Sequence, residues 1–349
     1  MKLKIGKRFV GDGEPCFIVA EAGVNHNGSL KLAKKLIDAA AKAGADAVKF
    51  QSFRADKLVL KKTPKAGYQK RTTGKKGTQY QMLKRLELSE KEQRALAKYA
   101  KIKKIIFFST PYDLESVELL KSLRVPAYKV ASADIVNIPL IERITKTKKP
   151  VIMSTGMATL GEVKHAIGTV RSAGNNKIIL MHCISEYPPE IKDSNLRVMQ
   201  TLKRNFGTVV GYSDNSAGLI TPLAAVALGA KVIEKHFTLS RRMKGPDHFA
   251  SLEPDEFKQM VEEIRTVESA LGTEKKILTK AEKRNKRVMR RGIYAAVKIK
   301  KGTRVKIGML AFMRPESSLK SSDYKKVVGK KVTKDIKTGQ ELKLSYFKA

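Results

Sequence analysis

Residues 151–185 read VIMSTGMATLGEVKHAIGTVRSAGNNKIILMHCIS and contain one strand–helix–strand unit. Two apolar, β-branched runs, 151–155 and 178–184, enclose a segment, 160–173, with apolar residues at helical spacing. Two buried strands joined by an amphipathic helix are the building block of parallel sheets. The first run ends at the polar residue Thr155, and the polar residue Ser185 directly follows the second. We therefore predict parallel strands whose carboxyl ends carry reactive side chains.

The same alternation extends outward along most of the chain. The helix predicted over 29–43 is typical, because Ser29 can cap its start and Gly44 can end it in the left-handed conformation. Further helices are expected over 90–100, 113–123, 160–173, 196–205, 222–228 and 254–271. Eight runs are expected to be strands: 16–22, 47–53, 105–110, 127–132, 151–155, 178–184, 208–213 and 232–237.

Eight strand–helix repeats predict an α/β fold, a (β/α)8 TIM barrel. A doubly wound sheet is the alternative, but no glycine-rich turn follows the first strand.

Two departures from the alternation divide the chain. The interval between the second and third strands is long, and its Gly/Lys/Thr-rich middle, 61–77, predicts an excursion over the barrel mouth. After residue 271 the helical periodicity ends. We predict a barrel domain over 1–271, a polar and basic linker over 272–290, and a small β-rich domain over 291–349.

The composition argues against several classes of protein. Lys plus Arg is 71 and Asp plus Glu is 33, which gives a net charge of +38. The basic residues are spread along the chain without a zinc-finger spacing, an RNP-like strand or a zipper, so we expect no specific nucleic-acid partner. A strongly positive field suits an anionic substrate instead.

Membrane and secretion signals are not found either. No apolar run reaches the length of a membrane helix, and residues 1–15 lack the apolar core of a signal peptide. Cys16 and Cys183 lie far apart inside apolar runs, which is typical of free buried thiols in a reducing compartment. We expect a cytoplasmic protein that does not associate with membranes.

Polar side chains follow all eight predicted strands, and the carboxyl ends of barrel strands carry the active site in TIM-barrel enzymes. Lys49 and Lys129 lie in apolar surroundings, where an unpaired charge is costly. With nearby hydroxyls they form a group of donors suited to phosphate and carboxylate. Either lysine can also be structural, paired with a carboxylate, and a strand-end serine can simply cap a helix. The hydroxyls are Thr110, Ser132, Ser154 and Ser213.

Three carboxylates and a histidine complete this set. Of Glu21, Asp134 and Asp247, one can act as a general base and another can hold sugar hydroxyls. His236, at the end of the last predicted strand, is a candidate metal ligand or acid.

Successive motifs resemble those of the sialic acid (nonulosonic acid) synthase family from about residue 17 to the C-terminus. The segment 290–315, RRGIYAAVKIKKGTRVKIGMLAFMRP, resembles the antifreeze-like (SAF) domain, a β-clip, that closes these enzymes. The barrel motifs are AEAGVNHNGSL, DAVKFQSF, TQYQMLKRLELS, FFSTPYD, YKVASADIVNIPLI, MSTGMATLGEV, HCISEYPP, VVGYSDNSAG and EKHFTLSRRMKGPDHFASLEP.

The resemblance implies a reaction and two substrates. Phosphoenolpyruvate adds through its methylene carbon to the aldehyde of an open-chain 2-acetamido sugar of the N-acetylmannosamine type, water attacks the oxocarbenium centre, and phosphate leaves with C–O cleavage. A divalent metal, Mn²⁺ or Mg²⁺, polarises the aldehyde. The residues implied to bind phosphoenolpyruvate are Lys49, Gln51, Thr110, Lys129, Ser132, Ser154, Ser185 and Ser213.

Further roles follow from the same resemblance. Asp134 is implied to orient or deprotonate the water, and His236 to hold the metal. The family forms domain-swapped homodimers in which the SAF domain covers the barrel of the partner subunit. The residues implied to hold the sugar are Glu21, Tyr187, Asp247 and, from the SAF domain, Arg314.

The chain departs from the family pattern at three places. Asn215 stands where a second metal-binding histidine is usual, and its amide oxygen is a weaker, harder ligand. We therefore expect looser or magnesium-leaning metal binding. Residues 71–74, Arg-Thr-Thr-Gly, replace a segment that often carries Asn in N-acetylmannosamine users, and 314–318 lack the usual glycine-containing turn beside Arg314.

These departures leave alternatives open. The sialic, legionaminic and pseudaminic branches fit the motifs, as does a phosphorylated acceptor. Another phosphoenolpyruvate–aldose condensing barrel is disfavoured by the SAF-like tail, and a catalytically idle basic scaffold has only Asn215 in its support.

Overall fold

The computed structural model describes residues 1–348. Contacts within the chain divide it into two compact units, with the boundary between Gly272 and Thr273. Each unit has its own hydrophobic core.

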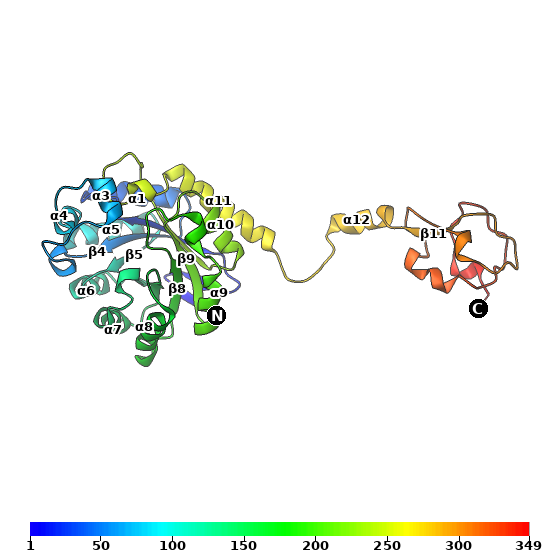
Figure 1. The fold of residues 1–349 in the computed structure, drawn as a ribbon, viewed down its shortest axis with the longest axis horizontal. Helices are drawn as coiled ribbons and strands as arrows, with labels where there is room; N and C mark the ends of the chain where they lie inside the picture. The colour runs from blue at the N-terminus through cyan, green and yellow to red at the C-terminus, as the bar shows by residue number, and fades with distance from the viewer. Residues whose placement is uncertain (349) are drawn as a thin grey trace. The chain divides into compact units, whose positions relative to one another are not determined.

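Eight parallel strands form the sheet at the centre of the first unit (Figure 1). Their order is β5-β4-β3-β10-β9-β8-β7-β6, and β5 and β6 at the two ends of this order lie alongside each other. The predicted TIM barrel is therefore confirmed, with every strand within two residues of its expected bounds. The strands are β3 Phe17–Gly23, β4 Ala47–Ser52, β5 Ile106–Pro111, β6 Tyr128–Val130, β7 Val151–Ser154, β8 Ile178–Cys183, β9 Val209–Asp214 and β10 Val232–His236.

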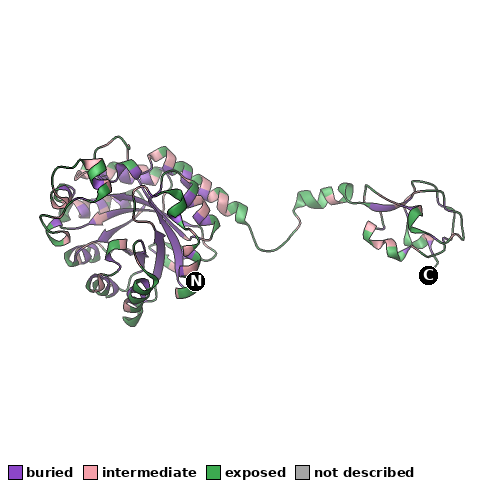
Figure 2. Ribbon diagram, viewed as in Figure 1, coloured by how far each residue is buried: buried purple, intermediate pink, exposed green. Residues whose placement is uncertain are grey.

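Helices surround the strands and bury one face each (Figure 2). In α1, Ser29 accepts a hydrogen bond from the Leu32 amide, and Gly44 beyond the helix end has φ +83°, as predicted. The eight-residue helix α7 was not predicted, although Asn137 caps its start and its buried residues Leu140, Ile141 and Ile144 recur at helical spacing. The helices are α1 Leu30–Lys42, α5 Glu90–Ile102, α6 Leu114–Ser122, α7 Ile138–Thr145, α8 Leu160–Ser172, α9 Val198–Phe206, α10 Ile220–Ala227 and α11 Pro254–Leu271.

The long excursion between β4 and β5 contains the short helices α2 Ala55–Leu58, α3 Gly67–Thr73 and α4 Gln79–Lys84. Its middle is organised by the buried Lys65, whose ammonium donates hydrogen bonds to the carbonyl oxygens of Gly74 and Lys76 at 3.0 and 2.9 Å. A side chain satisfied by backbone carbonyls fixes the path of this loop.

An N-terminal hairpin, β1 Lys2–Ile5 and β2 Arg8–Gly11, was not predicted. Ile5 and Val10 are fully buried in the barrel core, and β2 contacts β9. At its turn, Gly6 lies against Ile106, the first residue of β5. The hairpin therefore covers the amino ends of the strands. Strands of four residues in a charged, glycine-containing segment carry too little periodicity to be recognised.

The second unit contains α12 Lys280–Met289 and a small antiparallel pair, β11 Gly292–Ala295 and β12 Leu310–Met313. Helix α12 lies within the predicted linker, and Thr279 caps it in a capping box with Glu282. The remaining segment packs around a compact apolar core that includes Ile293, Val305, Val327, Ile336 and Leu342.

Among residues 1–348, no helix combines the length and the apolar character that crossing a bilayer requires.

The hairpin provides a test of this packing. Ile5→Ala should lower the free energy of unfolding of the barrel by about 2–5 kcal/mol, because Ile5 is fully buried and the cavity would not refill completely. Phe9→Ala, in the same hairpin but 47% exposed, should cost less than about 1 kcal/mol. Chemical denaturation measures both, and equal losses would contradict the role of the hairpin as part of the core.

Candidate active site

A cavity of about 420 Å³ opens at the carboxyl ends of the barrel strands. Most of the predicted site residues line it, although they come from all eight strands and the loops that follow. Those that line it are Glu21, Lys49, Gln51, Thr110, Lys129, Ser132, Ser154, Ser185, Tyr187, Ser213, Asn215 and His236.

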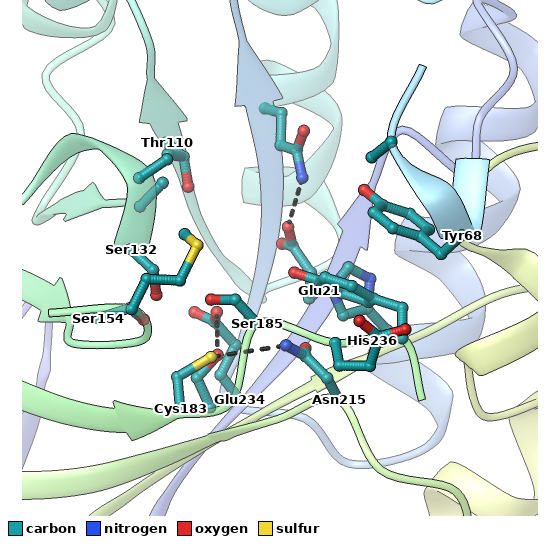
Figure 3. Close-up of a pocket in the computed structure, with 18 of the residues that line it drawn as sticks. Glu21, Tyr68, Thr110, Ser132, Ser154, Cys183, Ser185, Asn215, Glu234 and His236 are labelled. Carbon is teal, nitrogen blue, oxygen red and sulfur yellow. Dashed lines mark hydrogen bonds between the residues drawn. The ribbon is translucent and has the colours of Figure 1, made fainter. Parts of the chain in front are cut away.

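The two sides of the cavity differ in chemistry (Figure 3). Thr110, Ser132 and Ser154 lie on one side and present hydroxyl groups. On the other side lie Tyr68 and His236, with aromatic rings. A small anion and a larger organic molecule can therefore occupy the cavity together, each against a suitable wall.

Two buried lysines meet two buried glutamates at the bottom of the cavity. Lys49 Nζ lies 2.9 Å from Glu21 Oε2 and donates to Thr110 Oγ1, also at 2.9 Å. Glu234 Oε1 lies between the lysines, 3.8 Å from Lys49 Nζ and 3.6 Å from Lys129 Nζ. None of the four side chains is more than 7% exposed, so the charges interact with little screening by water.

The two lysines differ in how well their charge is compensated. Burial lowers the pKa of Lys129, and the carboxylate of Glu234 only partly offsets this, because the nearby charge of Lys49 also lowers the pKa. Burial also acts on Lys49, but the charges of Glu21 and Glu234 outweigh it and raise the pKa of that lysine. Burial raises the pKa of Glu21 as well. An anion bound beside Lys129 would supply the negative charge that this ammonium group lacks.

Glu234 lies in the last predicted strand, but its sequence context did not assign it a role. The alternation of β10 could have identified it, because residues two apart in a strand share a face and His236 was already assigned to the cavity. Lys235, between them, points to the other side, where it is fully buried and paired with Asp214 at 2.6 Å. Ser213 Oγ donates to Glu234 Oε1 at 3.0 Å.

Three loops converge at Gly156. A Cβ atom at this position would lie 2.4 Å from Ser185 Oγ and 2.9 Å from Ser132 Oγ, so only glycine allows these hydroxyls to approach. The Gly156 amide donates to Ser132 Oγ at 3.1 Å. The hydroxyl wall therefore depends on a residue without a side chain.

Cys183 is a free buried thiol, as predicted, and it also lines the cavity. Burial raises its pKa, which keeps it protonated and makes it a poor nucleophile.

The predicted metal ligands, His236 and Asn215, both line the cavity. Burial lowers the pKa of His236 and so favours the neutral imidazole, and its buried Nδ1 atom has no hydrogen-bond partner among the described residues. Asn215 donates its side-chain NH₂ to the Ile184 carbonyl at 2.8 Å, which leaves its Oδ1 atom as the free ligand. Within residues 1–348, no group of three His, Cys, Asp or Glu side chains could hold a metal. The two predicted ligands thus offer one nitrogen and one amide oxygen, and a divalent cation held by them would need water or substrate to complete its shell.

Asp134 and Asp247 are buried but are not among the residues that line the cavity. Asp134 lies in the 3-10 turn Ser132–Asp134, directly after two lining residues, and burial raises its pKa. Burial also raises the pKa of Asp247, and the charges of His236 and Glu21 act on it. Both carboxylates are therefore disposed to take up a proton near neutral pH more readily than an exposed aspartate.

The loop that carries Asp247 is attached to the loop after β3. His248 lies 2.7 Å from Thr238 Oγ1 through Nδ1 and donates from Nε2 to Asn27 Oδ1 at 3.2 Å. Asn27 in turn donates to the Lys244 carbonyl at 2.9 Å. These bonds fix the backbone on both sides of Asp247.

Two loops meet at the mouth of the cavity. The rings of Tyr68 in α3 and Tyr187 after β8 stack with centroids 4.8 Å apart, and Tyr187 packs edge-on against His236. Arg71 in α3 pairs with Glu186 at 3.0 Å. The predicted excursion therefore does border the site. Tyr68 was not predicted as a lining residue because nothing in the sequence marks where the excursion turns inward. Tyr112, which directly follows β5, was not assigned to the site either, although it stands at a predicted strand end.

Arg314 belongs to the second unit, where its side chain is exposed and contacts the Met289 sulfur at 3.6 Å. Its role toward a sugar, and the domain-swapped homodimer, stay predictions.

Comparisons with known proteins identify the family of both parts of the chain. Residues 36–276 match the model of the NeuB family, and residues 290–345 match that of the SAF domain. The N,N'-diacetyllegionaminic acid synthase of Campylobacter jejuni is 47% identical, covering 92% of this chain and 96% of its own. The human N-acetylneuraminate-9-phosphate synthase is 38% identical over 93% of this chain and 90% of its own. The crystal structure of the N-acetylneuraminic acid synthetase of Leptospira borgpetersenii serovar Hardjo-bovis, in complex with citrate, aligns with a TM-score of 0.73 and 36% identity, covering 82% of this chain and 95% of its own.

The attachment of the Asp247 loop predicts a pH dependence of stability. Burial lowers the pKa of His248 to about 4, below its unfolded value of about 6.5. As the pH falls through 6.5, the unfolded state binds a proton that the folded state does not, so stability decreases toward acid. This histidine should remove about 1–2 kcal/mol of unfolding free energy between pH 6.5 and pH 5.

His248→Gln should be less stable than the parent at pH 7 but lose less stability on acidification. Denaturant unfolding at several pH values measures the difference, with the exposed His165→Gln as the matched control. A His248→Gln profile parallel to that of the parent would show that His248 is not the group responsible.

Proposed function

The chain belongs to the NeuB family, and we propose that it condenses phosphoenolpyruvate with the aldehyde of a 2-acetamido sugar to give a nonulosonic acid and phosphate. The observation that carries this proposal is the buried Lys49–Glu234–Lys129 arrangement beside a wall of hydroxyls at the open end of the barrel. Curated relatives that match nearly the whole chain are synthases of legionaminic, pseudaminic and N-acetylneuraminic acids, the last as its 9-phosphate.

Phosphoenolpyruvate fits the deep part of the cavity. Its carboxylate and phosphate need two cations, and Lys49 and Lys129 are the buried cations that line this space. Ser132, Ser154 and Ser185 offer hydroxyl donors to the remaining oxygens, together with Gln51, Thr110 and Ser213. A bound dianion beside Lys129 would offset the burial that lowers the pKa of this lysine.

The acceptor sugar would occupy the aromatic side, with its aldehyde toward the methylene carbon of phosphoenolpyruvate. Glu21 and Tyr187 line that side, and Asp247 is close enough to His236 for the imidazole to influence the pKa of its carboxyl group. Carboxylates and a phenol are suitable partners for the hydroxyl and amide groups of an open-chain sugar.

The proposed reaction forms one C–C bond and breaks one C–O bond. The methylene carbon of phosphoenolpyruvate bonds to the aldehyde carbon, whose oxygen becomes a hydroxyl on taking a proton. Water then adds to the oxocarbenium carbon, with Asp134 taking up one of its protons, as the raised pKa of this aspartate allows. The resulting hemiketal loses phosphate, and the carbon becomes the ketone of the product.

A divalent cation, Mn²⁺ or Mg²⁺, would be held by His236 and by Oδ1 of Asn215. When bound, such an ion acts as a Lewis acid toward the aldehyde oxygen. Neutral His236, with its unpaired nitrogen, suits this role, and Asn215 keeps its oxygen available by committing its NH₂ group to Ile184.

One experiment separates this function from two others. Another phosphoenolpyruvate–aldose condensing activity would use the same deep site with a different acceptor. An idle scaffold would not turn over any acceptor. Phosphate release from phosphoenolpyruvate, measured with divalent metal and a panel of 2-acetamido and 2,4-diacetamido hexoses, and mass detection of the sugar acid distinguish the three. Folded protein that turns over none of these sugars would contradict the proposal.

Lys129→Met tests the deep anion site. Because the ammonium group is buried and would face the substrate anion, its loss should raise the KM for phosphoenolpyruvate at least about 30-fold. Lys164→Met, on the exposed face of α8, is the control. Steady-state kinetics with varied phosphoenolpyruvate give the result, and an unchanged KM would return Lys129 to a structural role.

Asn215→His tests the metal site. A second imidazole should tighten Mn²⁺ binding at least about tenfold, because a neutral imidazole nitrogen is a stronger donor to divalent metals than the neutral oxygen of a carboxamide. Calorimetric titration of the protein with Mn²⁺ alone measures this without turnover. The exposed Asn176→His is the control for added histidine, and equal affinities of the parent and Asn215→His would refute the assignment of Asn215 as a ligand.

A further inference from the structure

The mouth of the cavity is crossed by one ion pair. Arg71 in α3 and Glu186 after β8 both line the cavity, and their charged groups lie 3.0 Å apart. Their side chains are 64% and 56% exposed, in contrast to the buried lysines below. The pair therefore sits at the outer rim, where the two loops meet.

Positive and negative side chains are equal in number among the described residues that line the cavity. Among the described residues that line it, the cations are Lys49, Lys129 and Arg71, and the carboxylates are Glu21, Glu186 and Glu234. Both lysines lie at the bottom, where phosphoenolpyruvate requires them. Arg71 is thus the one lining cation at the rim, and Glu186 neutralises it.

The direction of the acceptor follows from the reaction. Its aldehyde carbon must face phosphoenolpyruvate at the bottom, so the opposite end of its six-carbon chain points toward the mouth. That end would lie toward the stacked rings of Tyr68 and Tyr187 and the Arg71–Glu186 pair. Whatever substituent the sugar carries at its sixth carbon is therefore selected at this rim.

We propose that Glu186, by holding Arg71 in an ion pair, makes this site select an acceptor that carries no phosphate at the end remote from its aldehyde. This inference rests on the proposed function and specifies its substrate class. A phosphate at the rim would face the repulsion of the Glu186 carboxylate, and it would meet an Arg71 whose positive charge Glu186 already offsets. An uncharged end avoids both costs and packs against the tyrosine rings.

Relatives of this chain differ in whether the product in their name carries a phosphate. One relative is named as a synthase of a 9-phosphate and others as synthases of acids named without phosphate. The ion pair at the rim supplies a physical reason for this chain to prefer the second kind.

The test compares N-acetylmannosamine with its 6-phosphate as acceptors, using kcat/KM in the presence of saturating phosphoenolpyruvate and metal. The parent should prefer the unphosphorylated sugar. Glu186→Gln should shift the ratio of the two kcat/KM values about tenfold toward the phosphate, because Arg71 is then free to bind it. Arg71→Gln should shift the ratio in the opposite direction, because Glu186 is left unopposed.

The variants should fold, since an exposed ion pair contributes little to stability. Glu190→Gln is the matched control: Glu190 lies in the same loop and forms an exposed pair with Lys192 at 2.7 Å, but it does not line the cavity. This control should leave the ratio unchanged.

The outcomes separate the inference from the function on which it rests. Turnover of both sugars by the parent with equal efficiency, or a ratio that neither Glu186→Gln nor Arg71→Gln alters, overturns the selection by Glu186 and leaves the synthase intact. An equal shift in Glu190→Gln assigns the effect to general charge and also overturns it. If the parent turns over neither sugar, both the proposed synthase activity toward these two acceptors and the inference about Glu186 are wrong.

Discussion

The burial of Lys49 and Lys129 is the constraint on which the open end of this barrel depends. An ammonium group in a water-poor site is unfavourable unless opposite charge and hydrogen-bond acceptors surround it. Glu234 lies between both lysines and Glu21 adds a second carboxylate beside Lys49 only. The positive charge of Lys129 is therefore less fully neutralised than that of Lys49, and Lys129 lies next to the hydroxyl wall.

The rest of the architecture keeps this cluster in place and accessible from one direction. Parallel strands bring residues that are distant in sequence to a common end, and the N-terminal hairpin covers the other end. Gly156 allows the hydroxyls of Ser132 and Ser185 to converge. Hydrogen bonds from Asn27 and His248 attach the two loops on the aromatic side to each other. Rigid elements thus hold the deep site, while loops form the rim.

Much of the barrel and of the deep site was predictable, because both follow from periodicity. Apolar runs of strand length followed by polar residues locate the strands, their order and their carboxyl ends. Glu234 escaped assignment although the alternation of β10 points it inward beside His236. The hairpin and Tyr68 were not predictable in this way, since short strands and long loops have no period and their positions depend on tertiary contacts. Asp134 and Asp247 were identified by sequence but lie just behind the cavity wall, a distinction that only packing decides.

The loop over the mouth owes its shape to Lys65, which bonds to backbone carbonyls and not to neighbouring side chains. Any residue can supply a carbonyl, so the positions that face the cavity are free to change while the path of the chain persists. Substitutions at positions such as Arg71 can thus change which molecules enter the cavity without a change in the barrel below. Diversity among descendants of such a barrel would accumulate in this segment first, and the condensing machinery below would stay as it was.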